Sequence, residues 1–236
     1  MPDLVPYITL RDGEQDTSDA ALTVQLVGGA PALGIPPRHK LTYLDEAAED
    51  RDPHGILLSR HTQNPLDAGG QPTGKPFWKA VNAARQRECM AALLCHVCKG
   101  EASKTDSGLL FLDIADDEAR TKPRWPQGWS TTQPPLCLPH AKAAADQCPH
   151  GKRNNGFTAL RVGRPLLAGI LGTLYRPSSI HPGGITPVKT NGVEEMVSLP
   201  FNHPHIPMLL GVQYQVALHN VTEVDLNEEL AAAGLA

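Results

Sequence analysis

The sequence predicts an α+β fold in which short strands and hairpins accompany two main helices. The 22 prolines and 21 glycines are spread along all 236 residues, which indicates many short elements joined by turns. A hydrophobic fraction of 41% is enough for a core, and an aromatic fraction of only 5% makes that core mainly aliphatic. A third observation is that closely spaced cysteine and histidine pairs lie beside the two strongest helical segments.

The first segment, residues 1–70, is expected to be β-rich and acidic. Its β-branched residues predict strands over 5–10 and 21–27, and a short strand near 56–59. Residues 64–76 are turn formers throughout, so they are the best candidate linker of the chain.

The middle segment, residues 71–155, contains the two helices. Good helix formers dominate 77–94 and predict the first helix. Residues 108–113 predict a strand, and 139–147 predict the second helix, with Pro139 in the first turn, where proline is tolerated. One apolar stripe of the first helix is expected to comprise Phe77, Val81, Ala84, Glu88 and Ala91.

The last segment, residues 156–236, is expected to mix strands and helix. Strands are predicted over 156–163 and 169–175, and the Asn191-Gly192 dipeptide is a strong hairpin signal.

A further helix is predicted over residues 207–220, because Leu210, Tyr214 and Ala217 are spaced for one helical face. A strand and a frayed helix are expected to end the chain. The three segments can also form one compact domain.

Six thiol or imidazole groups are candidates for a metal site: Cys95, Cys98, Cys137, His140, Cys148 and His150. A structural zinc ion takes four ligands, and two pairs with the spacing Cys-x-x-Cys and Cys-x-x-His supply four. Gly100 is expected to have a positive φ in the turn that holds the first pair. The preferred ligands of a structural Zn²⁺ ion are therefore Cys95, Cys98, Cys137 and His140.

A Cys-x-x-Cys turn, a hairpin and a helix that opens on the second pair resemble the treble-clef zinc modules over residues 93–148. The resemblance implies a zinc site and specifies no function.

Cys148 is the main competitor for a place in the ligand set. If 139–147 is helical, a rise of ~1.5 Å per residue separates Cys137 from Cys148 by more than ~12 Å, which is too far for one ion. Cys148 or His150 would replace a ligand only if that helix were absent. Cys89 is expected to be a small core residue of the first helix.

A zinc ion with four protein ligands and several thiolates has no open coordination position, so it is expected to be structural. The sequence therefore favours a zinc-stabilised binding or scaffolding protein over an enzyme. The alternative is a zinc-dependent enzyme, such as a treble-clef nuclease of the His-Asn-His type. It would use His150, Asn154 and Asn155, which no strand–helix pattern brings together.

The net charge of −4 conceals a segregation along the chain. Residues 1–70 carry 5 basic and 11 acidic side chains, residues 71–189 carry 16 and 8, and residues 190–236 carry none and 6. We expect a protein partner, with the acidic ends covering the basic middle. The second possibility is that 71–189 presents a basic face to nucleic acid. We prefer the first possibility, in which the acidic ends cover the basic middle segment, because no basic run with interleaved aromatic residues stands out.

The chain is expected to be cytoplasmic and to have no membrane segment. Its first residues lack the basic and apolar regions of a signal peptide, and its longest apolar stretch, 165–175, is too short to span a bilayer. Five cysteines, an odd number, favour metal binding over structural disulfides.

The strings "ARQRECMAALLCHVCKGEA", "QPPLCLPHA" and "ADQCPHG" resemble a family of uncharacterised actinobacterial proteins from about residue 40 onward. The shared features are Arg-Gln-Arg, Cys-x-x-Cys, Pro-Pro-x-Cys-x-x-His/Cys and a Cys-Pro. The resemblance implies a metal-binding accessory protein.

Overall fold

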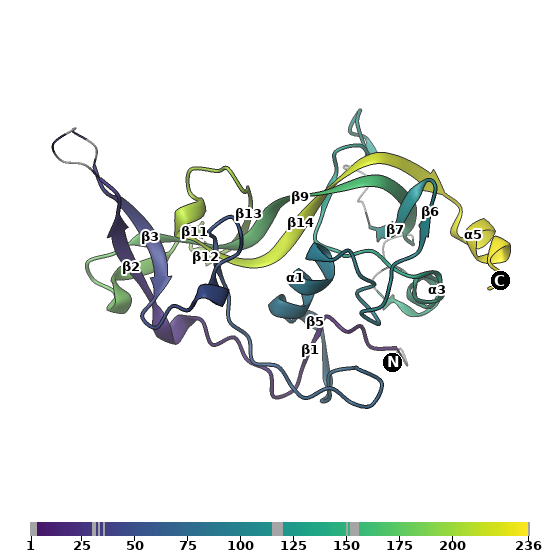
Figure 1. Ribbon diagram of the computed structural model, residues 1–236, viewed down its shortest axis with the longest axis horizontal. Coiled ribbons are helices and arrows are strands. Elements are labelled where there is room, and N and C mark those ends of the chain that lie inside the picture. Colours follow the sequence, from purple (N-terminus) through teal and green to yellow (C-terminus); the bar gives the residue numbers. More distant parts are fainter. Residues whose placement is uncertain are drawn as a thin grey trace. The chain divides into compact units, whose positions relative to one another are not determined.

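The computed structural model describes residues 4–29, 32, 34, 36–114, 120–149, 151 and 156–235 (Figure 1). Both strands and helices are present, so the predicted α+β class is confirmed. The chain divides into two compact units that interleave along the sequence. Unit 1 comprises Met1–Gly13, Asn64–Ala168 and Tyr214–Ala236, and unit 2 comprises Glu14–Gln63 and Gly169–Gln213.

Two long strands, β9 (Thr158–Pro177) and β14 (Leu209–Val224), contribute residues to both units. The other elements of unit 1 are β1 (Thr9–Arg11), β5 (Pro76–Val81), α1 (Ala83–Ala91), β6 (Lys104–Thr105), β7 (Gly108–Asp113), β8 (Ser130–Thr131), α3 (Leu138–Gln147) and α5 (Leu226–Ala232).

In unit 1, β7 lies antiparallel to the first half of β9, with Leu109 opposite Val162. On its other side β7 pairs with β6 to form a hairpin. The C-terminal part of β14 pairs with β8, and β1 pairs with β5 in a separate two-stranded sheet.

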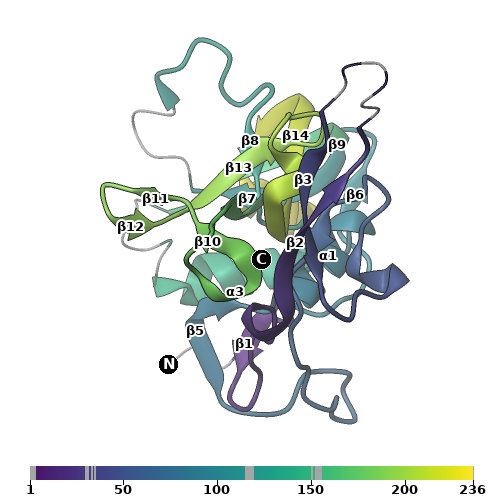
Figure 2. The same ribbon diagram turned by 90° about the vertical axis from the view of Figure 1, so that its left-hand side faces the viewer.

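In the described residues, unit 2 is built around strand pairs and four 3-10 turns. The elements of unit 2 are η1 (Asp19–Ala21), β2 (Leu22–Val27), β3 (Arg38–Tyr43), η3 (Ala48–Asp50), β4 (Leu57–Leu58), η4 (Pro182–Gly184), β10 (Ile185–Pro187), β11 (Lys189–Thr190), β12 (Val193–Glu194), β13 (Met196–Pro200) and η5 (Ile206–Met208). Strands β2 and β3 form an antiparallel ribbon, and β13 and β10 pair with the second half of β9. Figure 2 shows β11 and β12 as a short hairpin that extends away from β10.

Each unit has its own hydrophobic core. In unit 1, one core includes Cys95, Leu110, Leu136 and Ala141, so the turn after α1, the strand β7 and the helix α3 pack on one another. In unit 2, the core is formed by Leu22, Leu41, Tyr43, Leu57, Tyr175, Ile185 and Leu210. The candidate metal site therefore lies at the edge of a packed core in unit 1.

The helix predicted over 77–94 is shorter than expected. Residues 76–81 form the strand β5, and α1 begins only after Asn82, whose side chain accepts a hydrogen bond from the Arg85 N–H. The predicted apolar stripe is wrong, because Phe77 is 50% exposed and Glu88 is also exposed. A capping asparagine fixes a helix start more strongly than the propensities of the residues before it.

The helix predicted over 207–220 is wrong. Residues 207 and 208 end the turn η5, and 209–220 belong to β14, in which Tyr214, Val216 and Leu218 are buried and the residues between them are less so. Their spacing of two is the period of a strand, and β-branched and aromatic residues favour that state.

Several other predictions are confirmed. The strand over 108–113 is β7, the helix over 139–147 is α3, and Asn191 and Gly192 have φ values of 51° and 81° in the turn between β11 and β12. The two strands expected over 156–163 and 169–175 are one continuous strand, β9. The division into 1–70, 71–155 and 156–236 stays a prediction.

Candidate metal centre

The first pair of candidate ligands lies on a closed turn after α1. Leu93 has a φ of 53°, so the chain reverses directly beyond the helix end. The Cys95 N–H donates to the Gly100 carbonyl and the Lys99 N–H donates to the Cys95 carbonyl, each at 2.8 Å. These two hydrogen bonds hold Cys95 and Cys98 on one tight loop.

The expected positive φ at Gly100 is wrong, because Lys99 takes that conformation instead, with a φ of 60°. Gly100 serves the site in another way. Its N–H donates to the Cys98 Sγ at 3.4 Å, and an added Cβ would lie 3.3 Å from the same sulfur. Glycine at this position therefore leaves room for the sulfur and provides a hydrogen bond to it.

The chain between the two ligand pairs forms the β6–β7 hairpin and then returns toward the turn. The Leu136 N–H donates to the Leu110 carbonyl at 2.9 Å, and the Ser103 N–H donates to the Leu136 carbonyl at 2.8 Å. This backbone bonding places the residue before Cys137 against the hairpin.

His96, between the two cysteines of the first pair, fixes the return segment to the turn. Its Nδ1 lies 2.8 Å from the Pro134 carbonyl, and its backbone N–H donates to the Pro135 carbonyl at 3.2 Å. A carbonyl only accepts, so Nδ1 carries the hydrogen. Burial lowers the pKa of His96, which keeps the ring neutral. His96 is not among the site residues predicted from the sequence, although its place inside Cys-x-x-Cys is a usable signal.

The second pair opens α3. Cys137 is the N-cap residue, and its carbonyl accepts from the Ala141 N–H at 2.9 Å. Pro139 occupies the first turn, where its missing N–H leaves no intrahelical bond unmade. His140 follows Cys137 at a spacing of three, which places both side chains on the same side of the helix start.

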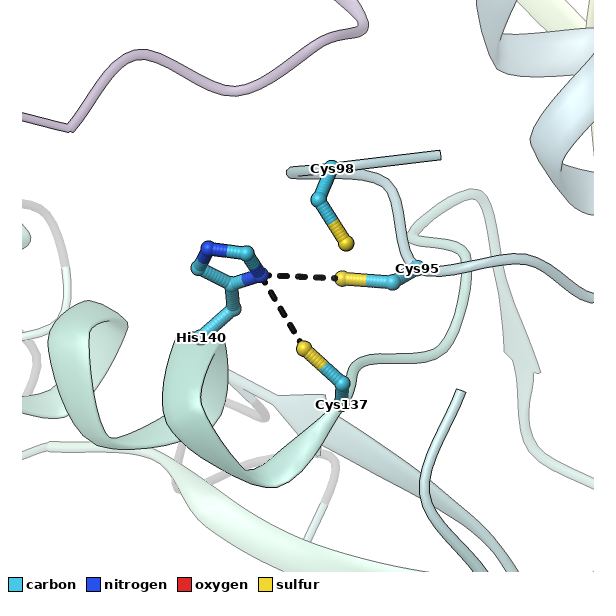
Figure 3. A group of neighbouring side chains, drawn as sticks. All are labelled: Cys95, Cys98, Cys137 and His140. Carbon is cyan, nitrogen blue, oxygen red and sulfur yellow. Dashed lines mark hydrogen bonds between the residues drawn. The ribbon is translucent and has the colours of Figure 1, made fainter. Parts of the chain in front are cut away.

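Figure 3 shows that the four side chains converge on one point, two from the turn and two from the start of α3. Their ligand atoms all lie within 4.8 Å of one another. The His140 Nδ1 is 3.6 Å from the Cys95 Sγ and 3.0 Å from the Cys137 Sγ. Cys95 is fully buried, and the other three are partly buried.

The environment of the cluster favours neutral side chains unless a cation is present. Burial raises the pKa of Cys98 and, with the neighbouring thiols, raises the pKa of Cys137 to about 12. Burial lowers the pKa of His140, so its imidazole is neutral and available as a ligand. A divalent cation reverses the effect on the thiols, because it stabilises thiolates at short range.

The donor set fits a zinc ion. Thiolate and imidazole are the ligands that Zn²⁺ prefers in structural sites, and four of them complete its tetrahedral coordination. Bond lengths of about 2.3 Å to sulfur and 2.0 Å to nitrogen would place the ligand atoms about 3.5–3.8 Å apart. The Cys95–His140 distance lies in this range, and the Cys137–His140 distance is somewhat shorter. This cluster can therefore hold a metal ion.

The other thiols lie outside the cluster. Cys148 is the C-cap residue of α3, at the opposite end from Cys137, and its N–H donates to the Ala144 carbonyl. Cys89 is fully buried in α1 and packs with Tyr7 and Ile8. His150, together with Asn154 and Asn155, falls outside the described residues.

The basic segment 71–189 does not form one body, because its last part belongs to unit 2. Unit 1 contains 15 basic and 15 acidic residues, and unit 2 contains 6 and 10. Arg161 of this segment and Glu229 of the C-terminal acidic flank form an ion pair within unit 1. The basic residues of unit 1 are therefore matched in number by acidic residues of the same unit.

Basic and tryptophan side chains do meet in the segment 120–129, contrary to the expectation that the chain has no basic run with interleaved aromatic residues. The Arg120 guanidinium lies 5.6 Å from the ring centre of Trp125, and the Lys122 amine lies 6.0 Å from that of Trp129. Each cation already occupies the face of an indole, so the stacking surface is partly used within the chain.

The histidine pair at 203 and 205 does not assemble a second metal cluster. The His205 N–H donates to the His203 Nδ1 at 3.2 Å, which occupies a potential ligand atom. Across the described part of the chain, the one cluster of suitable side chains is that at Cys95. No helix in the same part is long and apolar enough to cross a membrane.

In comparisons with known proteins, no family model, no curated protein and no solved structure matched this chain.

Proposed function

We propose that this protein is a zinc-stabilised binding or scaffolding protein in which one structural Zn²⁺ ion is held by Cys95, Cys98, Cys137 and His140. One observation carries the proposal: four donors of the zinc type converge within 4.8 Å from two separate elements. A cation there would join the turn after α1 to the start of α3. Because four protein donors fill a tetrahedral shell, the ion would be structural.

The order of turn, hairpin and helix supports a treble-clef module over 93–148. Five free cysteines support a reducing, cytoplasmic location. Membership of the actinobacterial group rests on the sequence strings alone.

A binding role is supported by a pair of exposed aromatic side chains in unit 1. Phe77 and Trp78 on β5 are 50% and 42% exposed, and Lys75 and Lys79 flank them in the sequence. Aromatic side chains of this kind are enriched in protein interfaces. The flanking lysines favour a partner protein whose surface combines apolar and acidic residues.

The nuclease alternative gains no support from a specific observation. Within the described residues, no further histidine or carboxylate joins the cluster to act as a base beside it. A zinc-dependent enzyme therefore remains the second hypothesis, in which a water molecule replaces one protein ligand of the zinc ion.

The test is metal analysis and cobalt substitution on protein purified under reducing conditions. We expect one zinc per chain, and a Co²⁺ form with the intense visible bands of a tetrahedral site rich in thiolates. Chelation should unfold residues 93–148, because zinc binding is folding energy for a site of this type. An unchanged circular dichroism spectrum and melting temperature after verified metal loss would contradict the structural role. Oxygen coordination in X-ray absorption would favour the enzyme.

A further inference from the structure

A second feature, within unit 2, lies where β9 ends. A cavity of about 310 Å³ is lined by Arg176, His181, Thr186, Pro187, Val188 and Lys189. The pairing of β10 with β9 places Thr186 directly opposite Arg176. Tyr175 is buried in the core, so the alternation of the strand turns Arg176 to the opposite face. Lys189 begins the β11–β12 hairpin that extends from β10 (Figure 2).

The basic side chains of this cavity have no side-chain partner within the part of the chain that the structure describes. Arg176 and Lys189 form no ion pair and no side-chain hydrogen bond among the described residues, and neither does His181. In the same unit, by contrast, Arg51 pairs with Glu46, and Arg60 pairs with two aspartates. The cations around the cavity therefore differ from Arg51 and Arg60, whose charges are already paired within unit 2.

We propose that this cavity binds the phosphate or sulfate group of a small molecule. Arg176, Lys189 and Thr186 line it and carry guanidinium, ammonium and hydroxyl groups, and a tetrahedral oxyanion offers an acceptor to each of these donors. The volume lies at the lower end of the range for small-molecule sites, which leaves room for a compact organic body. Pro187 and Val188 form the apolar part of the wall for that body.

One carboxylate opposes the bound anion. Glu194 lies across the β11–β12 hairpin from Lys189, with their Cα atoms in register. Cross-strand neighbours are within reach of each other's charge. Unit 2 as a whole carries 6 basic and 10 acidic residues, so attraction must act at short range. The binding should therefore be salt-sensitive, and the removal of the Glu194 charge should strengthen it.

The test uses the intact, zinc-loaded protein at low ionic strength, titrated by amide NMR with four probes: inorganic phosphate, sulfate, adenosine monophosphate and adenosine. The three anions should shift the amide signals of residues 176–189, and adenosine alone should not. Tighter binding of the phosphates than of sulfate would identify phosphate as the natural group, and the reverse order would identify sulfate. If none of the anions binds, the proposal is wrong.

Variants then locate the site. Arg176→Gln and Lys189→Gln should each weaken binding about five- to tenfold, roughly the contribution of one charge-assisted hydrogen bond at a partly exposed site. Arg176→Lys should weaken it less, and Glu194→Gln should strengthen it about two- to threefold. Arg164→Gln, an exposed arginine of β9 outside the cavity, is the matched control and should change nothing. Equal weakening by Arg164→Gln would show general charge attraction and would overturn the proposal. Circular dichroism of each variant checks folding.

Discussion

At the scale of single residues, the cysteines fall into two groups, those inside the metal cluster and those outside it. Cys95, Cys98 and Cys137 face one another with His140, whereas Cys148 sits at the far end of α3. Removing one donor from a four-ligand site leaves an open position and a weaker hold on the ion.

We therefore predict that Cys137→Ser loses zinc or solubility and that Cys148→Ser retains zinc at full stoichiometry. Cys89→Ala should also retain it, because that thiol packs in the core of α1. Metal content per chain after gel filtration checks this. Zinc retained in Cys137→Ser and lost in Cys148→Ser would mean that the wrong four ligands had been chosen.

Asp50 is a residue whose charge stabilises unit 2. Its carboxylate accepts hydrogen bonds from Arg60 at 2.7 and 2.5 Å and from the Ala47 N–H at 2.7 Å. The Arg60 hydrogen bonds lower the pKa of Asp50. An aspartate with a lowered folded pKa stabilises the protein above its unfolded pKa of about 3.9 and loses that contribution as the pH falls through the folded value.

We predict that Asp50→Asn lowers the free energy of unfolding at pH 7, and that the difference from the parent protein shrinks as the pH falls below about 4. Asp45→Asn is the matched control. Asp45 shares the partner Arg60, but its side chain is 70% exposed against 8% for Asp50, so its effect should be small. Urea denaturation at several pH values measures this. A constant deficit for Asp50→Asn down to pH 2 would contradict the prediction.

At the scale of elements, the β7–β9 pairing depends on close approach of two backbones. Gly108 begins β7 with a φ of 114°, and an added Cβ would lie 2.1 Å from the Val162 carbonyl oxygen. The Gly108 carbonyl also accepts from the buried Arg161 side chain, which further bonds to Ser103 and Glu229. Arg161, which lies in β9, therefore links Gly108 of the β6–β7 hairpin to Glu229 of α5.

We predict that Gly108→Ala destabilises the protein by about 3 kcal/mol or more, the range typical of a steric clash that the backbone cannot relieve. Gly128→Ala is the control, since Gly128 also has a positive φ, of 73°, but has open space at the Cβ position. It should cost only about 1–2 kcal/mol, from backbone strain. Thermal melts compare the two. Similar losses of stability in the two variants would mean that the positive φ, and not the close approach of the Val162 carbonyl, accounts for the effect at Gly108.

At the scale of the whole molecule, neither unit carries a net positive formal charge. The excess of basic residues in 71–189 is compensated in unit 1, which has no net formal charge, while unit 2 is acidic. A polyanion would release few counterions on binding such a protein.

We predict that the intact protein does not bind generic duplex or single-stranded nucleic acid with sub-micromolar affinity at moderate salt. A fluorescence titration at two salt concentrations measures this. Tight binding with a steep salt dependence would reverse the preference and make the segment 120–129, with its arginine, lysine and tryptophans, the first place to mutate.

The ligand set and its supporting elements were predictable because their signals are local. Two short spacings named the four donors, and Pro139 with an alanine-rich run defined α3. Less local features were harder to predict. The sequence predicts a positive φ at Gly100, whereas in the structure this glycine leaves room beside the Cys98 sulfur. That role depends on a contact in space, which the spacing of residues along the sequence does not show.

The sequence by itself determined the α+β class, the strand β7, the helix α3 and the turn at Asn191 and Gly192, because each depends on propensities and spacings within a few residues. Only the tertiary structure decided that 209–220 is part of a strand and that 77–81 forms a strand in place of the predicted helix. Residues such as Leu210, Tyr214 and Ala217 fit a helical stripe as well as part of a strand. The choice between these states came from hydrogen bonds to strands distant in the sequence, such as those of β14 with β4 and β8.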